Sequence, residues 1–207
     1  AVQSAQKFTQ EPLTASGVGI PLESQLYYNL GSATTQGVTS NFTQWTLMSW
    51  MGRAIYGFKD NRYMVTASLR YDGSSRLADG HKWVAFPSVA VAWRISSERF
   101  MEGTQSWLDD LKLRFSYGTA GNNNIPSGQM NLNYVSSATS WINGFSNYWA
   151  ASKTMPNSDL KWETTITRNI GLDFTVLGGK LNGSIEAYLN TTKDLLIQFP
   201  VSGTGYD

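Results

Sequence analysis

Residues 62–72 read Arg-Tyr-Met-Val-Thr-Ala-Ser-Leu-Arg-Tyr-Asp, a stretch in which apolar and polar side chains alternate. The odd positions, 63 to 71, carry Tyr, Val, Ala, Leu and Tyr, and the even positions, 64 to 72, carry Met, Thr, Ser, Arg and Asp. Successive side chains of a β-strand point to opposite faces. The stretch therefore predicts a strand with a mostly polar face and an apolar face that has a tyrosine at each end.

The same alternation recurs along the chain and predicts about six antiparallel strands. It is found at residues 44–58, 88–95, 111–118, 169–176 and 181–190. The first of these is apolar on both faces in its upper half, so its orientation is predicted only from Gly52 onward, with Arg53 on the polar face. The fold class predicted is all-β, with the strands belonging to an antiparallel transmembrane β-barrel.

Short and long connections alternate between these strands. Tight turns are predicted at 59–61 and 178–180, and a connection with a helical turn is predicted at 96–109. Loops are predicted at 73–83 and 119–163, and the second is too long for a compact soluble domain. Outer-membrane barrels have short periplasmic turns and long extracellular loops. Residues 1–43 are rich in Gly, Ser, Thr and Gln with weak periodicity, so they are predicted to be mostly extracellular loop, and residues 44–207 to form the barrel strands.

The composition excludes several classes of function. Charged residues make up 15% of the chain, against about 25% in typical soluble proteins, while aromatic residues reach 13%. A net charge of +1 argues against a nucleic-acid surface. The chain has no cysteine and one histidine, His81, so no catalytic set, metal site or cofactor site is expected. No stretch reaches the roughly 20 apolar residues of a membrane-spanning helix.

A soluble β-sandwich also has alternating strands. Its strands are short, however, with turns every 8–12 residues or so. The hairpin arms predicted here approach the roughly 9–11 residues that a strand needs to cross a bilayer at a tilt. Their aromatic ends match the aromatic girdles of membrane barrels. These features favour the membrane barrel over the sandwich.

Several segments resemble the SusC/RagA family of TonB-linked outer-membrane proteins. The resemblance covers roughly residues 45–195, and residues 1–43 contribute nothing to it. The segments that carry it are, in order, 61–76 (NRYMVTASLRYDGSSR), 86–88 (FPS), 92–96 (AWRIS), 108–114 (LDDLKLR), 116–118 (SYG), 121–122 (GN), 157–163 (NSDLKWE) and 171–174 (GLDF).

The resemblance implies a barrel of 22 strands, in the cell outer membrane, with a plugged lumen. The plug domain and the segment that contacts TonB are expected N-terminal to this chain and absent from it, so no energy-coupling residue is carried over to any position. The implied partners are TonB, through that missing region, and a SusD-like surface lipoprotein that closes over the extracellular mouth. The implied cargo is an oligosaccharide or a peptide.

The candidate contact residues lie in the predicted long loop. Trp141, Phe145, Tyr148 and Trp149 crowd into nine residues, where their rings can stack on a cargo or a lid protein, or can fold the loop on itself. Asn122, Asn123 and Asn124 are able to hydrogen-bond a polar ligand and are equally good turn formers.

Charged residues on the predicted polar faces are expected to pair with one another and with the plug. They are Arg53, Arg70, Arg94, Lys112 and Arg114, against Asp72, Asp173 and Glu186. The leading hypothesis is one part of an active TonB-dependent importer. The alternatives are a passive porin or an adhesin barrel, and a soluble carbohydrate-binding β-domain.

Overall fold

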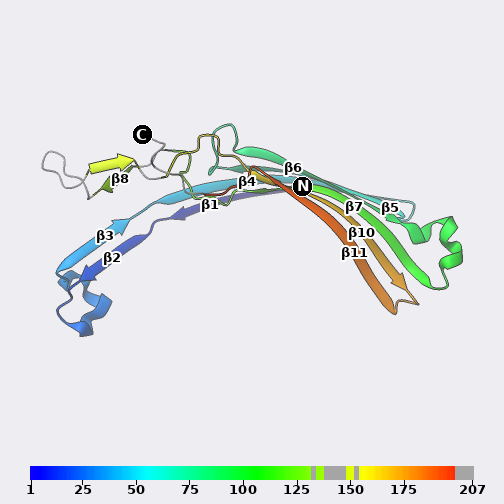
Figure 1. The fold of residues 1–207 in the computed structure, drawn as a ribbon, viewed down its shortest axis with the longest axis horizontal. Coiled ribbons are helices and arrows are strands. Elements are labelled where there is room, and N and C mark those ends of the chain that lie inside the picture. Colours follow the sequence, from blue (N-terminus) through cyan, green and yellow to red (C-terminus); the bar gives the residue numbers. More distant parts are fainter. Residues whose placement is uncertain (132–133, 138–147, 152–153, 199–207) are drawn as a thin grey trace.

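The protein is built around one antiparallel sheet (Figure 1). The computed structural model describes residues 1–131, 134–137, 148–151 and 154–198. Within this part of the chain the main sheet has seven strands in the order β1-β4-β5-β6-β7-β10-β11. The strands are β1 (Val2–Gln10), β4 (Thr43–Phe58), β5 (Tyr63–Ser74), β6 (Trp83–Arg94), β7 (Leu108–Asn122), β10 (Glu163–Val176) and β11 (Leu181–Lys193).

All six strands predicted from alternation are present, as β4 to β7, β10 and β11. They form a meander in which each strand pairs with the next of the six along the chain. The outermost strands, β1 and β11, each pair on one side only, so the sheet is open. An open antiparallel sheet with 12- to 16-residue strands in its centre is what a segment of a larger barrel provides.

Short connections lie at one end of the sheet and long ones at the other (Figure 1). Both predicted tight turns are confirmed, and their residues 59–61 and 177–179 have positive φ angles. The third connection at that end holds the 3-10 helices η2 (Ile95–Ser97) and η3 (Arg99–Thr104), which confirms the predicted helical turn. The opposite end carries loop 75–82 and connection 123–162, which includes the small hairpin β8 (Tyr134–Ser137) and β9 (Tyr148–Ala151).

The register assigns the paired strand residues to one of two faces, because cross-strand partners lie on the same face. One row joins Val65, Val91, Phe115, Ile170 and Ala187 across β5 to β11. We call the face with this apolar row the outer face. The neighbouring row on the other face, the inner face, runs through Thr66, Ala90, Ser116, Asn169 and Tyr188. Arg53 lies opposite Ser68 on the inner face, as predicted.

Aromatic side chains mark both ends of the outer face. At the long-loop end Trp50, Tyr71 and Trp83 stack on one another, with ring centroids 5.2 to 6.3 Å apart. At the turn end Tyr63 lies opposite Trp93 and next to Phe58. Trp83 and Trp93 are ten residues apart on β6, or about 33 Å along the strand. At a tilt of about 40° this equals the apolar band of about 25 Å that outer-membrane barrels present to lipid.

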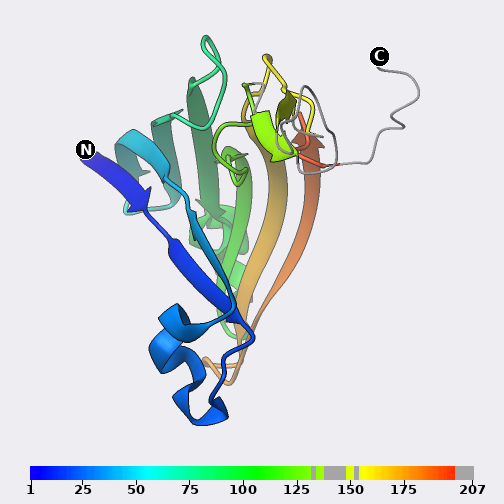
Figure 2. The ribbon, with the colours of Figure 1, turned by 90° about the vertical axis from the view of Figure 1, so that its left-hand side faces the viewer.

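Residues 1–43 contain more regular structure than the loop predicted for them. Strand β1 pairs with the upper half of β4, and a second hairpin continues it. This hairpin consists of β2 (Leu13–Val18), the 3-10 helix η1 (Glu23–Ser32) and β3 (Thr35–Ser40). We call residues 11–42 the arm. Both faces of β2 and β3 are mostly exposed, so their sequences show no alternation of apolar and polar residues that would predict strands. Backbone hydrogen bonds hold the two strands together. Figure 2 shows the arm in front of the strands from β6 to β11.

Candidate functional site

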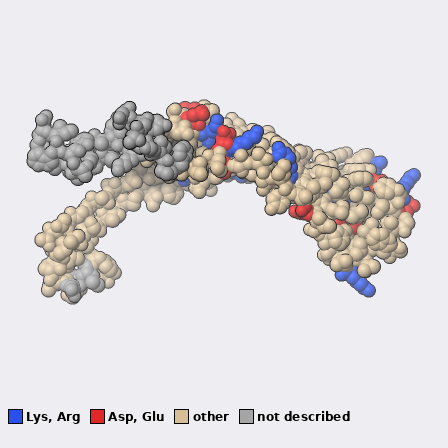
Figure 3. Space-filling model, viewed as in Figure 1, with Lys and Arg blue, Asp and Glu red and all other residues tan. Residues whose placement is uncertain are grey.

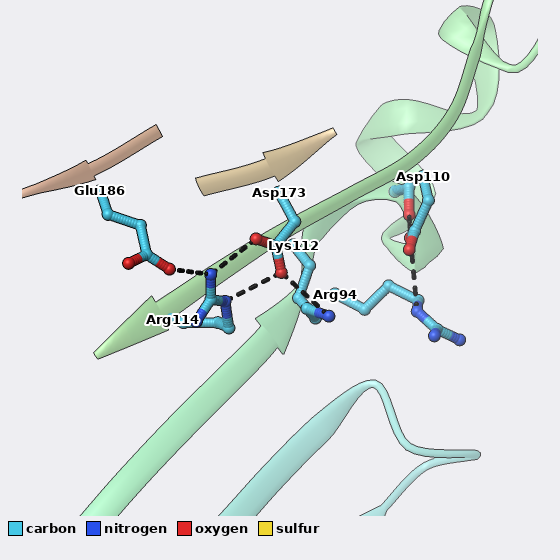
Figure 4. Close-up of polar contacts among 7 residues, drawn as sticks. Arg94, Asp110, Lys112, Arg114, Asp173 and Glu186 are labelled. Carbon is cyan, nitrogen blue, oxygen red and sulfur yellow. Dashed lines mark hydrogen bonds and ion pairs between the residues drawn. The ribbon is translucent and has the colours of Figure 1, made fainter. Parts of the chain in front are cut away.

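A network of ion pairs crosses the inner face (Figure 4). Arg114 of β7 donates to both carboxylate oxygens of Asp173 on β10, from Nε at 2.8 Å and from Nη2 at 2.7 Å. The same Nη2 donates to Glu186 Oε1 of β11 at 2.6 Å. Lys112 Nζ lies 3.0 Å from Asp173 Oδ2. One arginine therefore links three successive strands of the sheet.

A glycine makes this reach possible. Gly171 of β10 lies opposite Arg114 on one side and Glu186 on the other. A Cβ atom at Gly171 would lie 3.0 Å from Arg114 Nη2. The guanidinium group therefore crosses β10 over the bare glycine backbone and reaches the carboxylate on the far strand. The bidentate geometry gives the pair with Asp173 both strength and a defined orientation.

Most of the remaining inner charges are also paired. Arg70 Nε donates to Asp72 at 2.7 Å and its Nη2 donates to Ser49 at 3.3 Å. Arg94 Nε lies 3.4 Å from Asp110 Oδ1. Arg53 is exposed and makes no ion pair with the described residues. The predicted pairing among the inner charges is thus found for all of them except Arg53 and Arg94, because Arg94 pairs with Asp110, a carboxylate outside the predicted set.

A cluster of buried apolar residues lies at the long-loop end, and residue-level reasoning from the sequence missed it. Leu77, Phe86 and Trp162 are 0%, 4% and 4% exposed. Trp162 packs edge-on against Phe86 with ring centroids 5.5 Å apart, and its Nε1 donates to the carbonyl of Lys82 at 2.9 Å. A Cβ atom at Gly121 would lie 2.1 Å from Phe86 Cζ. The cluster joins loop 75–82 to the start of β10 and holds this loop over the end of the sheet.

The signal for this cluster lay in the family motifs. Phe86 belongs to the FPS segment, Gly121 to GN and Trp162 to NSDLKWE. The backbone N–H of Ala78 also donates to Leu160 of NSDLKWE at 2.9 Å. His81 Nε2 lies 2.8 Å from Asp159 Oδ1, so the single histidine joins the same two segments. These motifs therefore position loops at the long-loop end of the sheet.

The predicted asparagine triplet lies beside this cluster. Asn123 Nδ2 donates to Ser74 Oγ at 2.8 Å, and Asn122 Nδ2 donates to Glu163 Oε1 at 3.2 Å. The N–H of Asn124 donates to the side-chain oxygen of Asn122 at 3.0 Å, which closes a turn. Asn122 and Asn124 are exposed and Asn123 is half-buried. The triplet thus forms a turn, and it stays a candidate for contact with a ligand.

The predicted aromatic cluster cannot be placed in the same way. Trp141 and Phe145 lie outside the described residues. Tyr148 and Trp149 belong to β9, whose backbone pairs with β8. Their role in cargo or lid contact stays a prediction.

Glu98 organises the turn end of the sheet. Its carboxylate accepts hydrogen bonds from Tyr63 Oη at 2.6 Å, Trp93 Nε1 at 3.0 Å and Arg62 Nη1 at 3.2 Å. The bond from Tyr63 is the largest cause of a Glu98 pKa below its usual range, and the bond from Trp93 adds to the effect. One carboxylate between η2 and η3 thus holds the β4–β5 turn against the end of β6.

The arm has an apolar surface that faces solvent. Tyr27, Tyr28, Val38, Leu13 and Phe42 are all between 59% and 76% exposed. Glu23 is the only charged residue between positions 12 and 42. On the face shown in Figure 3, no charged side chain is visible on the described part of the hairpin formed by β2, η1 and β3, whereas charges are visible on the rest of the molecule. Exposed apolar surface of this extent is typical of regions that contact another protein or a membrane.

Two further properties concern possible binding chemistry. The described ranges hold no group of three or more His, Cys, Asp or Glu residues placed to bind a metal ion. Among the helices in the described part of the chain, none is long and apolar enough to span a membrane.

The comparisons with known proteins agree with this architecture. The family model for the TonB dependent receptor-like β-barrel matches residues 6–207. The chain belongs to this family. It is 38% identical over 174 residues to the TonB-dependent receptor SusC of Bacteroides thetaiotaomicron, which covers 82% of the chain and 17% of SusC. It is 32% identical over 207 residues to the TonB-dependent receptor P26 of Formosa agariphila, which covers 99% of the chain and 21% of that receptor.

Solved structures show the same fold. A structure of the RagAB peptide importer in the closed-closed state superposes with a TM-score of 0.84 at 25% identity, covering 98% of the chain and 22% of the importer chain. The importer in the open-open state gives a TM-score of 0.74 at 22% identity, covering 98% of the chain and 25% of that chain. The chain thus spans about a sixth to a quarter of the length of these proteins. The resemblance to the SusC/RagA family is confirmed.

Proposed function

We propose that the chain forms part of the channel wall of a TonB-dependent outer-membrane importer. The observation that carries the proposal is the division of the sheet into two faces. The outer face is apolar and bounded by aromatic residues over about 25 Å, which matches a lipid-facing surface. The inner face holds the paired charges around Arg114, which matches a wet or plugged lumen.

The orientation in the membrane follows from the connections. The short-turn end, with residues 59–62 and 177–180, is the periplasmic end. The long-loop end, with the arm and connection 123–162, is the extracellular end. The Leu77–Phe86–Trp162 cluster then holds the extracellular loops, and Glu98 holds the periplasmic turns.

A SusD-like lipoprotein is the partner we propose for the extracellular end. The exposed apolar surface of the arm and the candidate contact residues of connection 123–162 provide the area for it. The cargo is an oligosaccharide or a peptide, and a resemblance to a peptide importer supports the second. Arg53, unpaired among the described inner charges, is the residue we propose for contact with the plug.

Two measurements on the full-length protein test this proposal. Single cysteines replacing Ser158, at the long-loop end, and Lys180, at the turn end, are labelled in intact cells with a membrane-impermeant maleimide. Labelling at residue 158 alone is expected. Equal labelling of both positions contradicts the orientation.

Uptake of labelled peptides and oligosaccharides is then compared in cells with and without TonB. Loss of uptake without TonB is expected for an active importer. Uptake that persists without TonB supports a passive porin, and absence from the membrane fraction supports a soluble binding domain. Trp141→Ala and Phe145→Ala are expected to lower cargo or lipoprotein affinity, whereas unchanged affinity removes the aromatic cluster from the contact site.

A further inference from the structure

Arg168 is a charged residue on the otherwise apolar part of the outer face. The outward residues of β4 to β7, β10 and β11 all lie in the described part of the chain. Apart from Asp109, which lies in a bulge of β7 and accepts a hydrogen bond from Gly179 in the tight turn, only Arg168 and Lys193 among them are charged. Arg168 lies in β10 between Tyr117 and Leu189. Its side chain is exposed, and the polar contact that the structure gives it is a 3.3 Å hydrogen bond to Thr191 Oγ1. No carboxylate of the described residues pairs with it.

The depth of Arg168 along the outer face makes its charge energetically costly. Six residues separate it from Phe174, the outward aromatic residue next to the β10–β11 turn. That is about 20 Å along the strand, or about 15 Å along the membrane normal at a tilt of about 40°. Arg168 therefore lies inside the apolar band, about 10 Å below its extracellular edge. A charged side chain at this depth is costly unless its head reaches a polar partner at the interface.

A groove surrounds Arg168 on this face. The groove is shallow and open to the surroundings, with a volume of ≈ 550 Å³. Four strands contribute outward side chains to its lining, namely Val91, Phe115, Tyr117, Ile170, Ala187 and Leu189, together with Arg168 itself. The small side chain of Ala187, in the row of the much larger Phe115 and Ile170, leaves space in the surface.

We propose that this groove binds lipid A, the phosphorylated acyl lipid of the outer leaflet. An acyl chain occupies the apolar groove, and Arg168 extends along it to hold a phosphate at the headgroup level. A guanidinium group binds phosphate in a bidentate manner, which a zwitterionic or neutral headgroup does not satisfy equally well. Lys193 is four residues beyond Leu189 on β11, about 13 Å toward the extracellular end, where it faces the headgroups as a second cation.

The charge of the outer face supports this occupant. Outside the β7 bulge at Asp109, both charges of its six strands are cations, whereas the carboxylates Asp72, Asp173 and Glu186 all lie on the inner face. An anionic lipid therefore meets attraction and no opposing carboxylate. The choice of lipid A rests on the proposed orientation, because that orientation places the groove mouth in the outer leaflet.

The test measures lipid retention by the full-length protein in detergent with native mass spectrometry. The probes are lipid A, lipid A stripped of its phosphates, phosphatidylglycerol and phosphatidylethanolamine. The wild type is expected to retain lipid A in preference to the other three. Arg168→Gln should weaken lipid A retention about ten-fold or more, since it removes a charge-assisted hydrogen bond to phosphate. Arg99→Gln, which removes the same charge from the exposed 3-10 helix η3 at the turn end, is the matched control and should retain lipid A like the wild type.

A second variant separates the groove from the charge. Ala187→Phe fills the groove while keeping Arg168, and it should lower the retention of every acyl lipid. Equal retention of lipid A by the wild type and Arg168→Gln overturns the site, as does equal retention of dephosphorylated lipid A. Phosphatidylglycerol bound as tightly as lipid A overturns the choice of lipid. None of these readouts depends on uptake, so a failed lipid test with TonB-dependent uptake intact refutes this site alone.

Discussion

Placing an arginine on each face of β6 tests the division between lipid and lumen. Val89 lies on the outer face in the row of Ala67 and Tyr117, and its side chain is 43% exposed. Ala90, the next residue, lies on the inner face between Thr66 and Ser116. Val89→Arg and Ala90→Arg therefore place an arginine at adjacent positions in the sequence but on opposite faces of the sheet.

The expected cost follows from depth. Val89 is six residues from Trp83 and four from Trp93, which places it about 10 Å above the periplasmic girdle and about 15 Å below the extracellular one. Val89→Arg should therefore destabilise the barrel by about 2–4 kcal/mol, the cost near the midplane. Val91 is two residues from Trp93, so Val91→Arg should cost about 1 kcal/mol. Ala90→Arg points into a polar row and should cost about 0.5 kcal/mol.

The assay is urea unfolding of the full-length protein in vesicles of defined thickness, followed by tryptophan fluorescence. The three variants are measured against the wild type under identical conditions. The expected order of destabilisation is Val89→Arg, then Val91→Arg, then Ala90→Arg. Equal costs for Val89→Arg and Ala90→Arg would refute the two-faced arrangement, and a larger cost for Val91→Arg would refute the depth assigned to the band.

Three further predictions concern the inner face, the loops and the periplasmic turns. Asp173→Asn should destabilise the same protein in the urea assay by about 1–2 kcal/mol, because two cations lose a partly exposed partner. Asp110→Asn removes a single, longer ion pair and should cost less. Equal effects of the two variants would contradict the central role of the ion-pair network. Gly121→Ala should disrupt the buried loop cluster at a cost of about 1–3 kcal/mol and expose loop 75–82 to protease, whereas Gly52→Ala, with no atom within 4 Å of its Cβ, should not. Glu98 has a lowered pKa, so its stabilising effect is present above the usual glutamate range and is lost as the pH falls through the lowered value; the protection factors of the amides in residues 95–107, which correct for the intrinsic exchange rate at each pH, should fall with acid in the wild type and stay flat in Glu98→Gln, and parallel profiles for the two would contradict it.

The local alternation of apolar and polar residues predicted most of the strands of the main sheet. The side-chain period of a strand is two residues, so alternation alone identified β4 to β7, β10 and β11, their faces and the inward direction of Arg53. Turn residues such as Lys59, Asp60 and Gly178 marked the short connections for the same local reason. The family motifs then identified the class of protein, because their order and spacing along the chain are specific in a way that no single residue is.

Long-range pairing was beyond the reach of the sequence. Arg114 meets Asp173 and Glu186 across 59 and 72 residues, and which cation takes which carboxylate depends on the register of three strands and on the bare backbone at Gly171. Phe86 and Trp162 likewise meet only because two loops fold over the same end of the sheet. The arm stayed hidden because strands exposed on both faces need no alternation. The groove around Arg168 exists only once four strands lie side by side, since it is a property of the surface between strands and not of any one of them.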